Sequence, residues 1–167
     1  MQLLGWICAA HGAGNQGVWG RDTLWAVSQP TTHQLDAAGA AREARTILAE
    51  DPAALLDAWR FGVCQLIDDY QTARRHATPD LAAGLFKHSP APCGDCRFDA
   101  ALAALGEHLA RRDSRTPPTW VFEPERYAQP WWFVSGFSSL RAMELVQSPL
   151  AFRKRGVFIR DGDLVRA

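Results

Sequence analysis

The sequence predicts a mainly α-helical protein, a helical bundle of five to seven helices with a small extended element near the C-terminus. Apolar residues recur at three- and four-residue steps in two long segments, 56–70 and 98–109, which is the spacing of one face of an α-helix. The pair Asp51-Pro52 stands before the first of them, as an acidic cap followed by proline at the first helical position. No alternation of strands and helices indicates a parallel sheet.

Composition places the chain among soluble globular proteins. It has 167 residues, of which 47% are hydrophobic and 22% charged, enough for one domain with a core or for a small module joined to a larger one. No apolar run approaches the roughly 20 residues of a membrane span, and the start of the chain lacks the basic region of a signal peptide. Four cysteines do not make a disulfide scaffold, so we expect a reducing, cytoplasmic setting.

The N-terminal part, residues 1–35, has loop-forming glycines and one suggestive string. Residues 27–35, VSQPTTHQL, resemble the turn and recognition helix of a repressor-type helix-turn-helix, which reads base edges in the major groove. The basic residues that would contact phosphates are nearly absent. The segment is therefore either a loop leading into a helix or a degenerate helix-turn-helix that no longer binds DNA.

Two helices are predicted before residue 78. The first runs from 36 to about 50, is rich in alanine and has Asp36 as its cap. The second begins at Asp51-Pro52 and reaches about residue 75, with its apolar face formed by Leu56, Trp59, Val63, Leu66, Ile67 and Tyr70. The segment 76–95 contains three prolines and at most one helical turn, at 80–85. We place a boundary there, between an N-terminal helical module, 1–78, and a C-terminal tryptophan-rich domain, 92–167.

The C-terminal domain is predicted to contain a helix ending near residue 112, a second helix over 138–146 and a further turn after Ser148-Pro149. Residues 157–159 are apolar and β-branched or aromatic, which favours an extended segment. Asp161-Gly162 is typical of a two-residue hairpin turn, although the run after it is short enough to be a terminal helical turn instead.

Cys93-Gly-Asp-Cys96 is the clearest motif with chemical potential. It could be a helix entry, a redox pair, or half of a zinc site completed by Cys8-x-x-His11, with Cys64 and His88 as other donors. The redox interpretation requires a thioredoxin-like sheet that the chain does not indicate. We expect the helix entry, and neither metal nor cofactor.

No other cluster predicts catalysis. The five histidines are scattered, and none stands in a nucleophile signature; His108 beside Glu107 could be a base but fits a satisfied helix position better. The glycines at 12–17 lack the lysine of a phosphate loop. We therefore expect a protein that is not an enzyme.

The segment 119–167 carries the most distinctive chemistry. Three of the seven tryptophans lie in its first fourteen residues, and Arg153-Lys154-Arg155 follows. We expect Trp120, Trp132 and Phe133 in the core, with Arg153 and Arg155 as surface cations. Tryptophan and arginine are enriched at protein-interface hot spots, whereas base stacking beside phosphate contacts would suit nucleic acid. The candidate partner-binding residues are Trp131, Arg141, Arg153, Lys154, Arg155 and Phe158.

A family resemblance begins near Pro92 and continues to the end of the chain. It rests on Gly94-Asp95, Phe98-Asp99, Glu107-His108-Leu109-Ala110, Pro118, Trp120-Val121, Glu125-Arg126, Trp132-Phe133, Leu140-Arg141-Ala142, Ser148-Pro149 and the run from Phe152 to Phe158. These residues resemble the C-terminal domain of small actinobacterial proteins that usually carry a helix-turn-helix in front. In those relatives the slot of Cys93–Cys96 typically looks like Thr-Gly-Asp-Pro and serves as a helix entry.

The resemblance implies an antitoxin-like or regulatory partner of neighbouring genes, which are often nucleotidyltransferase-like toxins. We therefore expect a non-catalytic protein that binds and modulates a partner protein, a toxin encoded nearby being one candidate and a homodimer being allowed for. Residues 85–167 carry twelve basic and nine acidic side chains, a mild excess that favours an acidic partner. The formal net charge of the whole chain is zero, which argues against indiscriminate nucleic-acid binding. The alternatives are a DNA-binding regulator that reads with residues 27–35, or a zinc- or cysteine-dependent enzyme.

Overall fold

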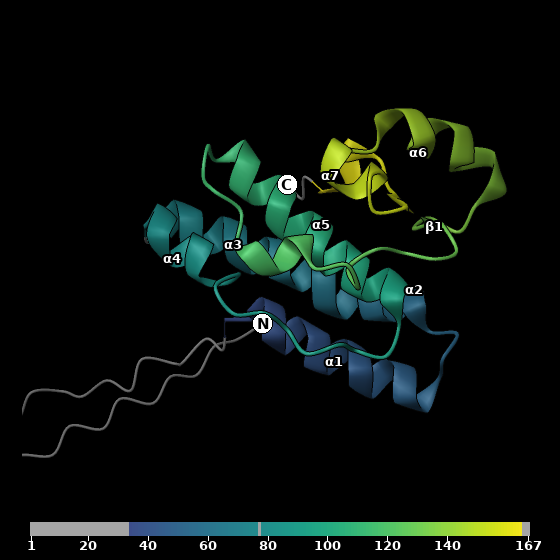
Figure 1. Ribbon diagram of the computed structural model, residues 1–167, viewed down its shortest axis with the longest axis horizontal. Helices are drawn as coiled ribbons and strands as arrows, with labels where there is room; N and C mark the ends of the chain where they lie inside the picture. The colour runs from purple at the N-terminus through teal and green to yellow at the C-terminus, as the bar shows by residue number, and fades with distance from the viewer. Residues whose placement is uncertain (1–33, 77, 165–167) are drawn as a thin grey trace, which may run out of the picture. The chain divides into compact units, whose positions relative to one another are not determined.

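The computed structural model describes residues 34–76 and 78–164. Contacts divide the chain into residues 1–31 and 32–167, and every described residue belongs to the second unit. This unit is mainly helical, and its only strands among the described residues are two short ones near the C-terminus (Figure 1). The predicted fold class is confirmed. Residues 1–33 lie outside the described part, and with them nearly all of the suggested helix-turn-helix.

The predicted N-terminal helices form, but the second is less regular than predicted and begins later: its first helical residue is Leu55, not Pro52. Helix α1 (Ala37–Glu50) begins where the Asp36 carboxylate accepts the Gly39 N–H at 2.6 Å, which is the expected cap. The second predicted helix is a continuous run of α2 (Leu55–Ala58), the π-helical segment η1 (Trp59–Cys64) and α3 (Gln65–His76). Gly62 lies in η1, where an added Cβ would be 2.8 Å from Phe98 Cζ. The absence of a side chain there lets Phe98 pack directly on the η1 backbone.

Helix α5 (Cys96–Arg112) is the central element of the unit. Eleven of its seventeen residues are buried, because it contacts α1 and η1 on one side and the C-terminal elements on others. Many of these buried residues are alanine or glycine, which lets neighbouring elements approach closely on several faces. The short helix α4 (Pro79–Gly84) precedes it, capped by the Thr78 hydroxyl, and confirms the helical turn predicted at 80–85.

The C-terminal part consists of short elements (Figure 1). They are η2 (Thr119–Phe122), β1 (Trp132–Phe133), η3 (Ser138–Leu140), α6 (Arg141–Gln147), α7 (Leu150–Arg153), β2 (Val157–Phe158) and η4 (Asp161–Leu164). Of these, η2, α7 and β2 pack on α5. Strands β1 and β2 pair in parallel, with Trp132 opposite Val157. The extended segment predicted at 157–159 is confirmed in β2. Asp161-Gly162 belongs to the 3₁₀ helix η4 (Asp161–Leu164), so the predicted hairpin turn is wrong and these residues begin a short helical turn instead.

One core spans both sides of the boundary that we placed in the proline-containing segment. The Trp59 ring of η1 meets Trp132 of β1 edge-on, with ring centroids 5.7 Å apart. The proline segment itself is held from both sides: Arg45 of α1 donates to the Pro92 carbonyl and Arg126 to the Pro90 carbonyl, each at 2.6 Å. Over their described residues, the predicted modules 1–78 and 92–167 therefore share a single core rather than meeting across a hinge.

Arg155 is a buried residue, which corrects the prediction that it is a surface cation. Its side chain has no exposed area and donates to Glu107 of α5 at 2.6 Å. It also donates to the carbonyls of Val121 and Ala151, at 2.6 and 2.8 Å. Sequence could not indicate this role, because the carboxylate partner lies 48 residues earlier in the chain. Arg155 thus ties α5, η2 and α7 together.

Glu107 accepts hydrogen bonds from three cationic side chains. Besides Arg155, Lys154 donates to it at 2.6 Å and Arg111 at 2.8 Å, and the Glu107 side chain is only 2% exposed. Burial raises the pKa of the Glu107 carboxyl, but the three cationic donors outweigh burial and lower that pKa from 4.5 to about 2. The ionised form is therefore the one that the fold stabilises.

The Glu107 cluster predicts acid sensitivity. A carboxyl whose pKa is lower in the folded state than in the unfolded chain stabilises the fold fully above the unfolded value, and that contribution is lost as pH falls toward the folded value. Between pH 5 and pH 2 the wild type should lose about 3 kcal/mol more unfolding free energy than Glu107→Gln, because one pKa unit corresponds to about 1.4 kcal/mol. Urea unfolding at several pH values measures both slopes. Equal slopes would contradict the assignment.

Candidate partner-binding surface

Helix α6 exposes apolar side chains and buries a charged one, the reverse of an ordinary surface helix. Its acidic residue Glu144 is fully buried, with 0% exposure, while Val146 is 78% exposed and Met143 and Leu145 are 43% and 39% exposed. A surface helix normally turns its apolar stripe inward and its charged residues outward. The apolar side of α6 therefore lies where solvent or a partner would meet it.

Polar contacts explain the inward orientation of Glu144. One carboxylate oxygen accepts the Ser135 N–H at 3.1 Å, and the other has no hydrogen-bond partner among the described residues. At the end of α6, the Ser148 hydroxyl accepts the Ile159 N–H at 2.7 Å and donates to the Ile159 carbonyl at 2.9 Å. These bonds hold α6 to the rest of the unit through polar groups, so its apolar side chains are not needed for attachment.

Exposed aromatic and aliphatic side chains continue beyond α6. Trp131 and Phe137 are each 66% exposed and Leu150 is 69% exposed. A series of ring contacts links Trp131 to the helix: Trp131 contacts Phe158, Phe158 stacks on Phe133 with centroids 4.9 Å apart, and the Arg141 guanidinium lies over Phe133. We call the exposed apolar set the α6 face, comprising Trp131, Phe137, Met143, Leu145, Val146 and Leu150.

The α6 face is almost without charge. Between residues 131 and 150 the only charged side chains are Arg141 and Glu144, and Glu144 is buried. Figure 1 shows α6 and the loop that leads to it extending beyond β1, away from α1 and α3. Among the exposed residues of this stretch, Arg141 is therefore the one charged side chain.

The predicted partner-binding residues divide into two groups in the structure. Trp131, Arg141 and Arg153 are exposed, and Lys154 is partly exposed but bound to Glu107. Arg155 and Phe158 are 1% and 3% exposed, so the prediction that they contact a partner is wrong. Arg155 is turned toward α5 by its bond to Glu107, and the ring of Phe158 is covered by Trp131 and Phe133.

Sequence reasoning missed most of the α6 face, namely Phe137, Met143, Leu145, Val146 and Leu150. The available signal was the run Ala142-Met-Glu-Leu-Val146, in which one acidic residue is set among apolar ones. Helical periodicity places Glu144 on the side opposite Val146, but it does not say which side faces inward. The usual assumption, that the charged side faces water, gives the wrong answer here.

The cysteine motif forms the expected helix entry. Gly94 has a φ of 104°, a conformation that favours glycine, and the Asp95 carboxylate caps α5 by accepting the Arg97 N–H at 2.8 Å. Burial, together with the nearby Asp99 carboxylate, raises the pKa of the Cys93 thiol to about 12, which opposes thiolate chemistry at neutral pH.

The described residues do not support the zinc hypothesis. Across 34–76 and 78–164, no group of three or more His, Cys, Asp or Glu side chains is placed to hold a metal ion. The suggested second half of the site, Cys8-x-x-His11, lies outside the described part of the chain. Within that part, Cys93 and Cys96 have a structural role at the start of α5.

His108 packs as a structural residue. Its ring meets Phe152 edge-on with centroids 6.1 Å apart, and burial lowers the pKa of its imidazole. The neighbouring carboxylate, Glu107, is occupied by its three cationic donors. The His108 ring therefore does not form an acid–base site with Glu107.

Comparison with protein-family models, with curated proteins and with solved structures found no match for this chain. The described part of the chain contains no helix with the length and apolar character needed to cross a membrane.

Proposed function

We propose that this protein is a non-catalytic, antitoxin-like or regulatory protein that binds a partner protein through the α6 face. The proposal rests on the exposure pattern of α6, in which Val146 is 78% exposed while Glu144 is fully buried. Soluble proteins rarely leave a large apolar patch open to water unless it serves an interaction. Covering the α6 face with a partner would remove this area from solvent and so stabilise the complex.

The composition of the α6 face supports a protein partner. Aromatic residues, methionine and arginine are enriched at the centres of protein interfaces, whereas lysine, aspartate and glutamate are depleted there. Trp131, Phe137, Met143 and Arg141 are residues of the first kind, and none of the second kind is exposed between 131 and 150. A nucleic-acid surface would instead present several cations to the phosphates.

The partner's surface should be apolar with at least one carboxylate. Arg141 and Arg153 form no ion pair with any residue in the described ranges, 34–76 and 78–164. Each guanidinium is therefore available to an acidic group of the partner. Such pairs increase the association rate and fix the orientation more than they raise affinity.

The antitoxin-like aspect rests on the resemblance that runs from about Pro92 to the end of the chain, which points to the product of a neighbouring gene as the partner. Cys93 and Cys96 are both free thiols, which fits a reducing compartment. We place the protein in the cytoplasm on that ground and on the composition.

Co-expression with each adjacent gene product, followed by co-purification, tests the proposal. We expect the wild type to retain one of these proteins and Val146→Asp to bind it about 30-fold more weakly, because burying an unpaired charge at a hot spot costs about 2 kcal/mol or more. Leu81→Asp is the matched control: Leu81 is 51% exposed on α4, outside the α6 face. Its binding should equal that of the wild type.

Both variants should melt close to the wild-type temperature, since each changes an exposed side chain. The proposal fails if no neighbouring product is retained by the wild type. It also fails if folded Val146→Asp retains the partner as well as Leu81→Asp does.

A further inference from the structure

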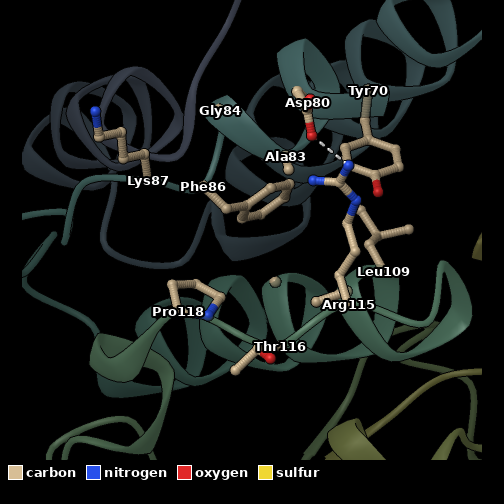
Figure 2. A pocket seen from close by; sticks show the side chains of 12 residues that line it. Tyr70, Asp80, Ala83, Gly84, Phe86, Lys87, Leu109, Arg115, Thr116 and Pro118 are labelled. Atoms are coloured by element: carbon tan, nitrogen blue, oxygen red, sulfur yellow. Dashed lines mark hydrogen bonds and ion pairs between the residues drawn. The ribbon is translucent and has the colours of Figure 1, made fainter. Parts of the chain in front are cut away.

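A hollow of about 350 Å³ lies between α3 and α4 on one side and α5 with the turn after it on the other (Figure 2). Ala83, Phe86, Leu109 and Pro118 supply its apolar lining. The volume is at the lower end of the range of about 300–1,000 Å³ that small-molecule pockets occupy. None of the α6-face residues lines the hollow, so a ligand bound there would not depend on the proposed function.

Two glycines, Gly84 and Gly106, line the hollow. An added Cβ on Gly106 of α5 would be 3.0 Å from Phe86 Cδ1 and 3.3 Å from Val121 Cγ1, so the Phe86 ring rests against the α5 backbone. The Phe86 carbonyl also accepts the Trp120 indole N–H at 2.9 Å. Gly84, at the edge of the hollow, has nothing within 4 Å of where its Cβ would be. The apolar floor is thus formed before any ligand arrives.

Arg115 supplies a positive charge with donors to spare. Its backbone N–H donates to the Ala110 carbonyl at 2.7 Å, which fixes where its side chain begins. The guanidinium pairs with Asp80 of α4 through Nη2 alone (Figure 2). Its Nε and Nη1 groups have no hydrogen-bond partner within the part of the chain that the structure describes. The Arg115 side chain is 33% exposed, so the guanidinium is reachable from the hollow.

The carboxylate that now pairs with Arg115 is replaceable. The Asp80 side chain is 87% exposed, and exposed ion pairs contribute little to stability. Tyr70, which also lines the hollow, is already engaged, because its hydroxyl donates to Asp113 at 2.6 Å. Tyr70 therefore offers its ring to a ligand, and Arg115 offers its hydrogen-bond donors.

We infer that this hollow binds a small aromatic carboxylate. The ring of the ligand lies against Phe86 and Leu109. Its carboxylate pairs with the guanidinium of Arg115, either replacing Asp80 or binding beside it. A planar guanidinium with two free N–H groups suits the two oxygens of a carboxylate. Charge complementarity selects an acid over the corresponding neutral amide.

An NMR titration of the full chain with 2-naphthoate, and with 2-naphthamide as the uncharged match, tests the inference. We expect 2-naphthoate to shift the amides of Gly84, Gly106 and Thr116 and to bind more tightly than the amide. Arg115→Gln should weaken 2-naphthoate about tenfold, as expected for hydrogen bonds to a charged group, and leave 2-naphthamide unchanged. Asp80→Asn should strengthen 2-naphthoate about two- to fivefold, because it removes the competing carboxylate.

Val146→Asp is the control for unspecific binding to the α6 face and should bind 2-naphthoate like the wild type. Equal affinities of the acid and the amide would overturn the inference. So would shifts confined to α6, or an Arg115→Gln protein, folded by its melting curve, that binds 2-naphthoate normally. None of these results would bear on partner binding, which the co-purification of Val146→Asp decides separately.

Discussion

Replacing Arg155 by alanine should destabilise the folded protein by about 3–5 kcal/mol, the usual cost of breaking a buried ion pair by removing one partner. The change leaves Glu107 buried without its closest fully buried cation. It also leaves the carbonyls of Val121 and Ala151 without the donors that they now accept from, and an unsatisfied buried acceptor costs about 1–3 kcal/mol. Natural domains have unfolding free energies of about 5–15 kcal/mol, so this substitution should remove a large part of the protein's stability. Urea unfolding measures the loss.

Arg153→Ala is the matched control for Arg155→Ala. Arg153 lies two residues earlier, is exposed and forms no ion pair among the described residues. Its removal should change the unfolding free energy by less than about 0.5 kcal/mol, the usual effect of a surface substitution. Equal effects of the two substitutions would mean that Arg155 is not buried against Glu107.

Replacing Trp120 by alanine should cost about 3–5 kcal/mol, as for other large buried aromatics. Trp120 is 4% exposed, and its ring lies under the guanidinium of Arg126. Its indole N–H also donates to the Phe86 carbonyl. The loss of the ring leaves a cavity between η2 and the segment before α5, and thermal or urea unfolding measures its cost.

Trp120→Phe distinguishes the contribution of the aromatic ring to stability from that of the indole hydrogen bond. The substitution keeps much of the side-chain volume but loses the donor to the Phe86 carbonyl. It should therefore lower the unfolding free energy measurably, but by less than Trp120→Ala does. Phe133→Ala provides a comparison, because the Phe133 ring is only half-buried and its loss should cost less than that of Trp120. From the sequence we expected both Trp120 and Phe133 in the core, and the half-buried position of Phe133 corrects that expectation for Phe133. A Trp120→Ala protein as stable as Phe133→Ala would contradict the packing.

The features that sequence predicted are those decided by local chemistry. Asp36 and Asp95 cap helices because their carboxylates reach backbone N–H groups two or three residues ahead. The spacing of apolar residues in the second helix and in α5 likewise indicates the buried face of each helix from neighbouring residues alone. Helix positions, the extended segment at 157–159 and the helix entry at Cys93–Cys96 therefore followed from short windows of the chain.

The features that sequence did not predict depend on distant contacts. The burial of Arg155 requires Glu107, 48 residues earlier, and β1 exists only because β2 pairs with it from about 25 residues further along the chain. The orientation of Glu144 depends on the Ser135 N–H and on where Ile159 meets Ser148. No local pattern carries these pairings, so Arg155 was assigned to the surface and most of the α6 face was not identified.

Hydroxyl-radical footprinting of the protein alone and in complex with its co-purified partner measures which side chains the partner covers. Trp131, Phe137 and Met143 are exposed, so all three should be oxidised in the free protein and protected in the complex. Phe61, 60% exposed in η1 and outside the α6 face, should be oxidised equally in both. Unchanged oxidation of Trp131, Phe137 and Met143, with protection elsewhere on the chain, would contradict the assignment of the α6 face as the binding surface.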